Sequence, residues 1–245
     1  MNVYLAGNIK SKVKGVGSLE RVWILTSFYD IPAKTIPDYI FGERHILDSG
    51  AFSFFGGKTV DWEAYTRLYA AFIKRTNQKL FFEMDIDRIT STIYAERLRT
   101  MIEDITGQQT IPVWRPMRGI EYWYRMCEEY KYVAISASGM YDSAWTRTKA
   151  AVPVLQKMLA IARERGVKVH GLGYTNCKTL PVLPFASIDS TTWLSAGRYG
   201  IIYNFVNNTL QPTKQKKQRI ADNKTADRHN FTEWVKFQQY AEQFL

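Results

Sequence analysis

The chain has few of the residues that would mark a disulfide-bonded or zinc-stabilised protein. Its 245 residues include two cysteines, Cys127 and Cys177, which stand far apart without a pairing pattern. We therefore expect a reducing compartment. Since the chain also has only three histidines, a structural zinc site is not expected, and we predict no bound metal.

Long apolar runs are also absent. No stretch of about 18 apolar residues occurs, so the sequence predicts no membrane-spanning helix. The first residues, Met1-Asn2-Val3-Tyr4, are not a basic segment followed by an apolar core, so we expect no signal peptide. Together these features predict a cytoplasmic protein, in the host cytoplasm if a phage encodes it.

Positive charge is plentiful by contrast. Lysine and arginine number 33 against 23 acidic residues, which gives a net charge of +10. Such a balance suits a polyanionic partner, with nucleic acid as the first candidate. A generally basic, soluble surface explains the same number, and composition alone leaves both readings open.

Short apolar runs alternate with amphipathic segments along most of the chain. Nine runs are strand candidates: 2–7, 22–28, 45–48, 79–87, 110–114, 132–136, 167–171, 185–189 and 200–205. Alternation of strands and helices predicts parallel strands joined by right-handed crossovers. We predict an α/β fold, a (β/α)8 TIM barrel formed as a single domain by residues 1–245, with one strand accessory. A basic loop at 211–228 and a closing helix at 229–244 complete it. An open doubly wound sheet is the rival, but the chain has no phosphate-binding glycine motif.

Polar residues follow several of the predicted strands. In a barrel, the active site lies at the carboxyl ends of the strands. The residues found there are Asp48, Asp85, Asp87, Trp114, Ser136, His170, Gly171 and Asp189. Acids, small residues and aromatics on one rim suit a planar ligand that forms hydrogen bonds.

Two of these acids, Asp48 and Asp189, are predicted to meet across one pocket. Two carboxylates flanking a sugar bond suit glycosidic chemistry, one as nucleophile and the other as acid and base. A glycosidic bond joins a base to a sugar as well as a sugar to a sugar. Either acid alone could instead cap the helix that follows its strand.

The segment Leu47-Asp48-Ser49-Gly50-Ala51-Phe52-Ser53 resembles the Asp-Ser-Gly-Gly-aromatic motif of tRNA-guanine transglycosylases, and more closely that of the DpdA-type paralogues, which insert 7-deazaguanines into DNA. The segment His170-Gly171-Leu172-Gly173 resembles the Met-Gly-Val-Gly segment of that family. Asp189 follows it at a spacing similar to that of the family's nucleophile. The resemblance covers residues 45–205.

This resemblance implies a base exchange that needs no cofactor. By position, Asp189 would attack C1′ of a guanine nucleotide, and Asp48 would donate a proton to the departing base. Phe52 and His170 would stack on the two faces of the base, and Asp85 or Asp87 would read its N–H edge. The remaining implied contacts come from Ser49, Ser136 and Gly171. A free 7-deazaguanine base would be the co-substrate.

Departures from the family pattern point to DNA. The cysteine-rich zinc subdomain of the tRNA enzymes is missing, and Ser190-Thr191-Thr192 stands where basic tRNA contacts are expected. Trp114 with Arg115 replaces a base-binding glutamine, so base choice can differ. The implied function is a short, phage-type DNA-guanine transglycosylase. A zinc-free tRNA enzyme, a catalytically inactive nucleic-acid-binding barrel and a sugar-cleaving glycosidase are the alternatives.

The basic loop supports a nucleic-acid partner. Residues 211–228 carry six basic and two acidic side chains, a net of 6 − 2 = +4. We expect phosphate contacts from Lys214, Lys216, Lys217 and Arg219, because this loop follows the last predicted strand. A buried pocket also requires a flipped or single-stranded guanine. The sequence says nothing of oligomeric state.

Overall fold

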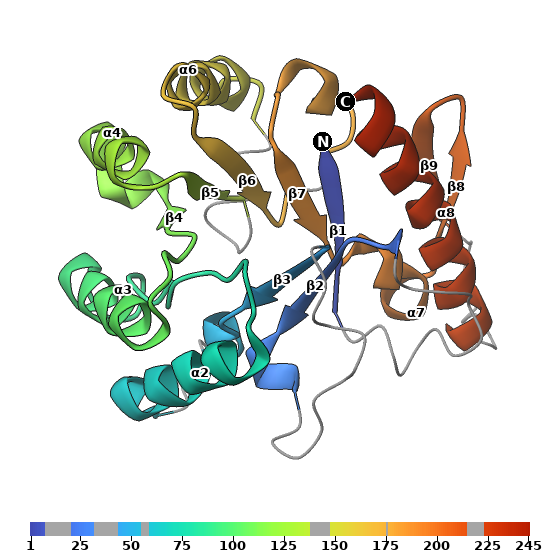
Figure 1. Cartoon of the computed structure of the whole chain (residues 1–245). Coiled ribbons are helices and arrows are strands. Elements are labelled where there is room, and N and C mark those ends of the chain that lie inside the picture. The colour runs from blue at the N-terminus through green and yellow to red at the C-terminus, as the bar shows by residue number, and fades with distance from the viewer. Residues whose placement is uncertain (8–20, 32–43, 55–58, 138–147, 175, 215–222) are drawn as a thin grey trace.

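A parallel β-sheet organises the structure, a computed structural model that describes residues 1–7, 21–31, 44–54, 59–137, 148–174, 176–214 and 223–245. The strands are β1 (Asn2–Ala6), β2 (Ile24–Ser27), β3 (His45–Asp48), β4 (Val113–Trp114), β5 (Tyr132–Ser136), β6 (Lys168–Leu172) and β7 (Ser187–Ser190). All neighbouring pairs are parallel, in the order β3-β2-β1-β7-β6-β5-β4. Figure 1 shows that the sheet curls, with helices on its outer side. The predicted α/β class is therefore confirmed.

The predicted closed barrel of eight regular strands is not what the structure has. The segment expected to form a strand at 79–87 makes only two single parallel bridges, Leu47 with Phe81 and Phe82 with Ile111. Beyond these bridges, Oε1 of Glu83 accepts the Val113 N–H at 2.7 Å, in the place that a backbone carbonyl takes in a regular ladder. The sheet is a seven-stranded half-barrel.

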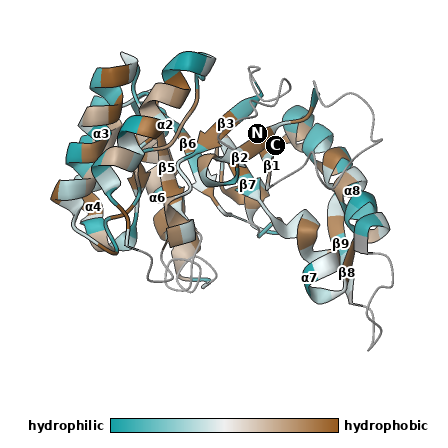
Figure 2. Cartoon of the chain, turned by 90° about the horizontal axis from the view of Figure 1, so that it is seen from below, coloured by the Kyte–Doolittle hydropathy of each residue, from teal (hydrophilic) through white to brown (hydrophobic). Residues whose placement is uncertain are grey.

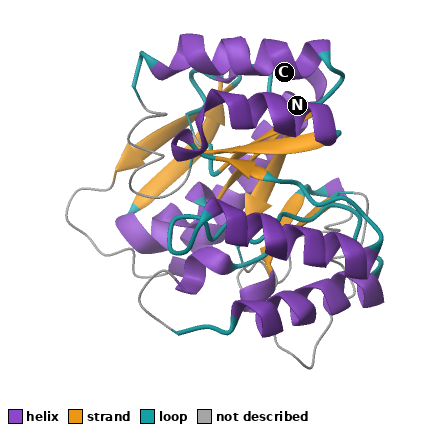
Figure 3. Cartoon of the chain, turned by 90° about the vertical axis from the view of Figure 1, so that its left-hand side faces the viewer, coloured by secondary structure: helices purple, strands orange, loops and turns teal. Residues whose placement is uncertain are grey.

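Helices cover the outer face of the curled sheet. They are α2 (Trp62–Thr76), α3 (Thr92–Thr106), α4 (Gly119–Glu129), α6 (Ala151–Glu164), α7 (Ser195–Tyr199) and α8 (Asn223–Phe244). Short 3-10 turns lie at Phe28–Asp30, Ala51–Phe54, Pro116–Arg118, Leu180–Val182 and Thr192–Leu194. Side chains start two of the long helices, since Asp61 accepts the Ala64 N–H and Ser91 accepts the Tyr94 N–H. Figure 3 shows the strands enclosed between these helices.

The last predicted strand was placed in the wrong sheet. Residues 200–205 were expected to join the parallel barrel, but β8 (Ile201–Val206) pairs antiparallel with β9 (Thr209–Lys214) in a separate hairpin. Asn207 and Asn208 connect the two strands, both at positive φ (50° and 62°), as a two-residue hairpin turn requires. The predicted basic loop therefore begins in a strand, and α8 begins at Asn223 rather than at 229.

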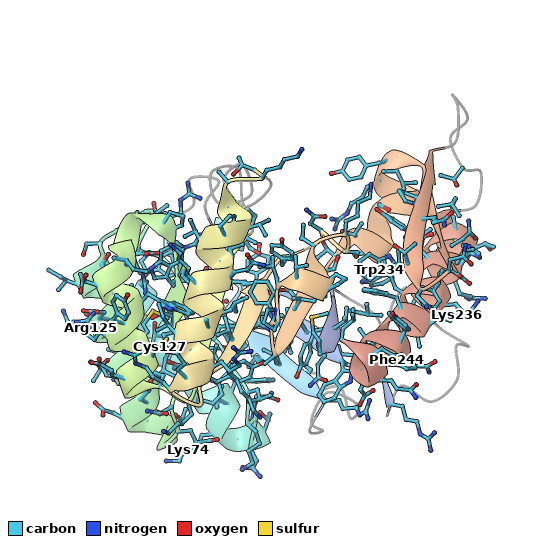
Figure 4. The ribbon with its side chains drawn as sticks, turned by 90° about the horizontal axis from the view of Figure 1, so that it is seen from above. Lys74, Arg125, Cys127, Trp234, Lys236 and Phe244 are labelled. Atoms are coloured by element: carbon cyan, nitrogen blue, oxygen red, sulfur yellow. The ribbon has the colours of Figure 1, made fainter. Side chains whose placement is uncertain are left out.

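The core has an inner and an outer layer because successive strand residues face opposite sides of the sheet. The inner layer gathers one buried residue from most strands: Tyr4, Leu25, Ile46, Phe82, Val113, Ala134 and Leu172. The outer layer packs the alternate residues, such as Val3 and Ile135, against the helices. Figure 2 shows apolar residues concentrated where helices meet the sheet. Cys127 belongs to this outer layer and is buried on α4 (Figure 4). Neither cysteine forms a disulfide.

The last helix ties the two ends of the chain together. Gln238 of α8 donates to the Val3 carbonyl at 2.6 Å, and the Met1 amino group donates to the Ala241 carbonyl at 3.1 Å. The hairpin β8–β9 packs beside the same helix (Figure 1). Within the described ranges, no helix combines the length and the apolar character needed to cross a membrane.

Candidate active site

The two acids predicted to act together project from the same edge of the sheet. Asp48 is the last residue of β3, and Asp189 is the third of the four residues of β7. Because the seven strands are parallel, both residues lie toward the carboxyl edge. The strands β2 and β1 separate them along the sheet, and the charge of Asp189 still acts on Asp48.

Asp48 is held by the turn that follows its strand. Its Oδ2 accepts the Gly50 N–H at 2.9 Å. The pKa of this carboxyl is raised to about 7, first by burial and then by the charge of Asp85. The Gly50 hydrogen bond opposes this rise, and the charge of Asp189 adds to it. The charges of Asp85 and Asp189 thus both raise the pKa of Asp48, and with a pKa of about 7 its carboxyl is partly protonated at neutral pH.

The turn after Asp48 needs glycine and presents an aromatic ring. Gly50 has φ +77°, and a Cβ there would lie 2.6 Å from the Tyr29 Cβ. Ser49 is fully buried, and its hydroxyl accepts the Ala51 N–H, so it builds the turn. Phe52 projects from the turn with 59% of its surface exposed. Phe52 can therefore cover a bound ligand, whereas the Ser49 side chain has a structural contact.

Asp189 is buried and firmly oriented. Its Oδ1 accepts the Gly173 N–H at 2.6 Å and contacts Nε2 of His170 at 3.1 Å. His170 was predicted to stack on a base, and in the structure it contacts Asp189. The ring is 0% exposed, with the Phe82 ring 5.1 Å and the Tyr4 ring 6.0 Å away, and both of its nitrogens are hydrogen-bonded. In this position the imidazole orients the Asp189 carboxylate through its hydrogen bond to Oδ1.

Gly171 follows His170 and faces the opposite side of the sheet. A Cβ at Gly171 would lie 3.0 Å from the Tyr174 Cβ and 3.2 Å from Ile188. The missing side chain therefore allows close packing in the outer layer. Any contact of Gly171 with a ligand would have to come from its backbone.

The segment that forms the two single bridges carries three acids, Glu83, Asp85 and Asp87, and three buried arginines pair with them. Arg115 binds Asp85 at 2.5 Å and lies 3.4 Å from Asp87. Arg118 binds Asp87 at 2.7 Å and Glu83 at 3.0 Å. The third arginine, Arg99, binds Glu83 at 3.3 Å. Burying this many charges is tolerated only because each acid has a cationic partner.

The network separates the two candidate base readers. The Asp87 side chain is 0% exposed and ion-paired, whereas the Asp85 side chain keeps 10% exposure and senses Asp48. Burial raises the pKa of Asp85 to about 6, with Arg115 opposing that rise and Asp87 adding to it. Ser136, at the end of β5, accepts from Arg115 at 3.1 Å and is fully buried. Asp85 is therefore the acid of this network that faces the site.

Trp114 was predicted to contact the base, and in the structure its ring lies away from the two acids. Its ring lies in the outer layer against Trp123, at 6.3 Å between centroids, and its Nε1 donates to the Gly119 carbonyl at 2.7 Å. The neighbouring Arg115 faces the inner side instead. Residue alternation along β4 causes this reversal.

The arginines Arg99 and Arg118 were not predicted as part of the site. A signal was present in Arg99, which lies among the apolar residues Ala95, Leu98 and Ile102 of α3 and is itself 6% exposed. A charge on a buried helix face requires a partner, and the acids at 83–87 supply one in Glu83, with Glu96 on the same helix at 3.6 Å.

The predicted phosphate contacts fall mostly outside the described residues. Lys216, Lys217 and Arg219 lie in 215–222, and Lys214 is the last residue of β9. A surface hollow of about 450 Å³ lies elsewhere, lined by side chains of α2 and α3 such as Arg67 and Arg97. Across the part of the chain that the structure describes, no group of three acidic, histidine or cysteine residues could hold a metal.

Comparison of the chain with protein-family models and with curated proteins found no match.

Proposed function

We propose that this protein is a DNA-guanine transglycosylase, a pentosyltransferase that exchanges guanine for a 7-deazaguanine. One observation carries the proposal: Asp48 and Asp189 project from the carboxyl edge of one sheet and differ in their surroundings. Asp48 has a raised pKa near 7. Asp189 is hydrogen-bonded to the Gly173 N–H and to the His170 imidazole. A protonated acid beside an oriented carboxylate is what double displacement at C1′ requires.

The first half of the exchange breaks the bond between guanine and its sugar. Oδ2 of Asp189 attacks C1′, and a covalent ester forms. The bonding electrons leave with guanine, which takes the proton of Asp48. Asp48 then carries a negative charge, so it is ready to act as a base.

The second half rebuilds the nucleotide with a new base. Asp48 removes the N9 proton of the incoming 7-deazaguanine, and N9 attacks C1′. The ester bond breaks and Asp189 regains its charge. Two inversions at C1′ retain the configuration of the sugar, and no cofactor is consumed.

Recognition of the base would use the residues around the two acids. Phe52 stacks on the exposed face of the base. Asp85 accepts hydrogen bonds from the N–H edge of the base, and Arg115 holds the Asp85 carboxylate in place. Phe81 and Phe82 form single bridges to β3 and to the segment before β4 on this side of the half-barrel. Ser136 supports the Arg115 guanidinium.

DNA is the favoured substrate because the chain is strongly basic and because it lacks the cysteines of a zinc subdomain. A net charge of +10 suits a polyanion, and Lys214, Lys216, Lys217 and Arg219 follow the hairpin strand β8 in sequence. Two cysteines do not suffice for the zinc subdomain of tRNA enzymes. The guanine must be flipped out of the duplex or already single-stranded. We place this activity in the cytoplasm, which is the host's if the chain is phage-encoded.

Labelled 7-deazaguanine precursors test the substrate. They are incubated with the protein and duplex DNA, single-stranded DNA or tRNA, and label in purified nucleic acid is counted. Label in DNA supports the proposal. Label only in tRNA identifies a zinc-free tRNA-guanine transglycosylase instead.

A nucleic-acid-binding barrel without catalysis is the candidate from another class. The basic composition alone favours it, and it predicts tight DNA binding with no exchange of any base. A glycosidase would use the same two acids, but it predicts hydrolysis of oligosaccharides and leaves the net charge of +10 unexplained.

A further inference from the structure

A chain of hydrogen bonds runs from Tyr132, the half-buried first residue of β5, to Asp189. The Tyr132 hydroxyl lies 2.5 Å from the Ser187 Oγ, which in turn lies 2.5 Å from Nδ1 of His170. Nε2 of the same ring lies 3.1 Å from Oδ1 of Asp189. His170 is 0% exposed and Ser187 is 1% exposed, so water does not compete for the bond between these two residues.

If the imidazole is neutral, the chemistry of these groups fixes the direction of every bond. An ionised carboxylate only accepts, so Nε2 of His170 must carry a hydrogen. Nδ1 of a neutral ring is then an acceptor, and Ser187 must donate to it. The remaining lone pair of Ser187 accepts from Tyr132, whose hydroxyl keeps its proton because burial raises its pKa to about 12. A neutral imidazole of one tautomer satisfies all four residues.

We infer that His170 is a positioning residue for Asp189, and that Ser187 and Tyr132 hold its ring in the tautomer with hydrogen on Nε2. Together with the Gly173 N–H, this ring fixes Oδ1 and leaves Oδ2 to attack C1′. The catalytic meaning rests on the proposed function. The hydrogen-bond chain itself does not.

Two donors, the Gly173 N–H and Nε2 of His170, bind the same oxygen of Asp189 and orient its carboxylate. The titratable groups around the imidazole are Tyr4 from β1, Tyr132 from β5, which reaches the ring through Ser187, and Asp189 from β7. Phe82, on the remaining side, is apolar.

Nitrogen NMR of ¹⁵N-histidine protein tests the tautomer without any substrate. The chain has three histidines, so His170→Leu assigns the signal by its loss. We expect one ring with a protonated Nε2 and an unprotonated Nδ1 at neutral pH, and we expect Ser187→Ala to move the two nitrogens toward equal shifts. A hydrogen on Nδ1, or no response to Ser187→Ala, overturns the inference.

Kinetics test the role of the ring in exchange. Loss of one hydrogen bond to a charged group in His170→Leu should lower kcat about 10- to 100-fold with KM unchanged. The acidic limb of the kcat profile should move up by about one pH unit. His170→Gln, whose amide can donate from a similar position, should recover most of both.

Equal losses in the two variants, with an unmoved pH profile, would reduce His170 to packing and overturn the inference. Wild-type protein that exchanges no base, yet shows the expected tautomer, would contradict the proposed function alone. The two failures are therefore distinguishable.

Discussion

The charge of Asp189, on β7, raises the pKa of Asp48, on β3, although the two strands are separated in the sheet by β2 and β1. Asp85 acts on the same carboxyl more strongly. Three acids therefore share one electrostatic environment. Asp85 has an arginine as a direct partner, whereas burial and these neighbouring charges raise the pKa of Asp48 to about 7.

The rate of exchange should fall as the pH rises through about 7. Asp48 must be protonated to release guanine, and its pKa is raised to about 7. The measurement is kcat against pH with single-stranded DNA as substrate. A rate that is flat from pH 6 to 9 would exclude Asp48 as the acid.

The same raised pKa predicts a stability effect that needs no substrate. The folded state keeps a proton on Asp48 between about pH 4 and 7 that the unfolded chain releases, so folding loses stability as the pH rises through this window. Asp48→Asn removes this loss. It should stabilise the protein by about 2 kcal/mol at pH 8, after discounting for solvent around a half-buried group, and by almost nothing at pH 4.

Thermal unfolding at both pH values measures this difference. Asp104→Asn, which changes an exposed acid on α3, is the control and should show no such pH dependence. An Asp48→Asn variant that is equally stable or less stable at pH 8 would contradict the assigned protonation.

The turn after Asp48 should not accept a side chain. Gly50→Ala places a Cβ 2.6 Å from the Tyr29 Cβ and 2.7 Å from the Ser27 Oγ, at φ +77°. Gly107→Ala is the matched control, because its φ is +69° and nothing lies within 4 Å. We expect about 1–2 kcal/mol for Gly107→Ala and about 1–3 kcal/mol more for Gly50→Ala, measured by urea unfolding. Equal losses would show that the turn has room to adjust.

Removing one buried arginine should cost far more than removing an exposed one. Arg118→Ala leaves Glu83 and Asp87 short of a partner and should destabilise the fold by about 3–5 kcal/mol. Arg125→Ala is the control, because Arg125 also covers the Tyr122 ring but pairs with Glu96 at the surface (Figure 4). Its loss should cost less than about 1 kcal/mol. Similar unfolding midpoints for both variants would contradict the ionic network.

Phe52 should matter for the base and not for the fold. Phe52 has 59% of its surface exposed, so Phe52→Ala removes little packing. Loss of a stacked ring should raise KM for the free base by roughly 5- to 100-fold. Phe244→Ala, with 62% exposure at the end of α8, should change neither KM nor stability appreciably (Figure 4). An unchanged KM in Phe52→Ala would remove Phe52 from the site.

The sequence was informative where a strand ends in a polar residue. Asp48 and Asp189 could be found because an apolar run closing in an acid points to the carboxyl edge of a sheet. It was misleading at β4, since two residues give no alternation from which to tell that Trp114 faces out and Arg115 faces in. His170 looked like a ligand contact because sequence does not reveal that Ser187 and Asp189 occupy both ring nitrogens.

The hairpin was missed although its signal was present. Asn207-Asn208 between two six-residue β-rich runs is a turn that tolerates positive φ, and it predicts an antiparallel pair rather than a barrel strand. The missing eighth strand has no such signal. In its place the Glu83 side chain accepts the Val113 N–H, a contact that only the folded chain defines.

Mass spectrometry of nucleosides from treated DNA tests the two-acid exchange most directly. Single-stranded DNA is incubated with a 7-deazaguanine base and wild-type protein, Asp189→Asn or Asp48→Asn, then digested and analysed. We predict a 7-deazaguanine nucleoside with wild-type protein alone, and a protein–DNA adduct that Asp189→Asn abolishes. Unmodified nucleosides from the wild-type reaction, or equal incorporation by Asp189→Asn, would contradict the account.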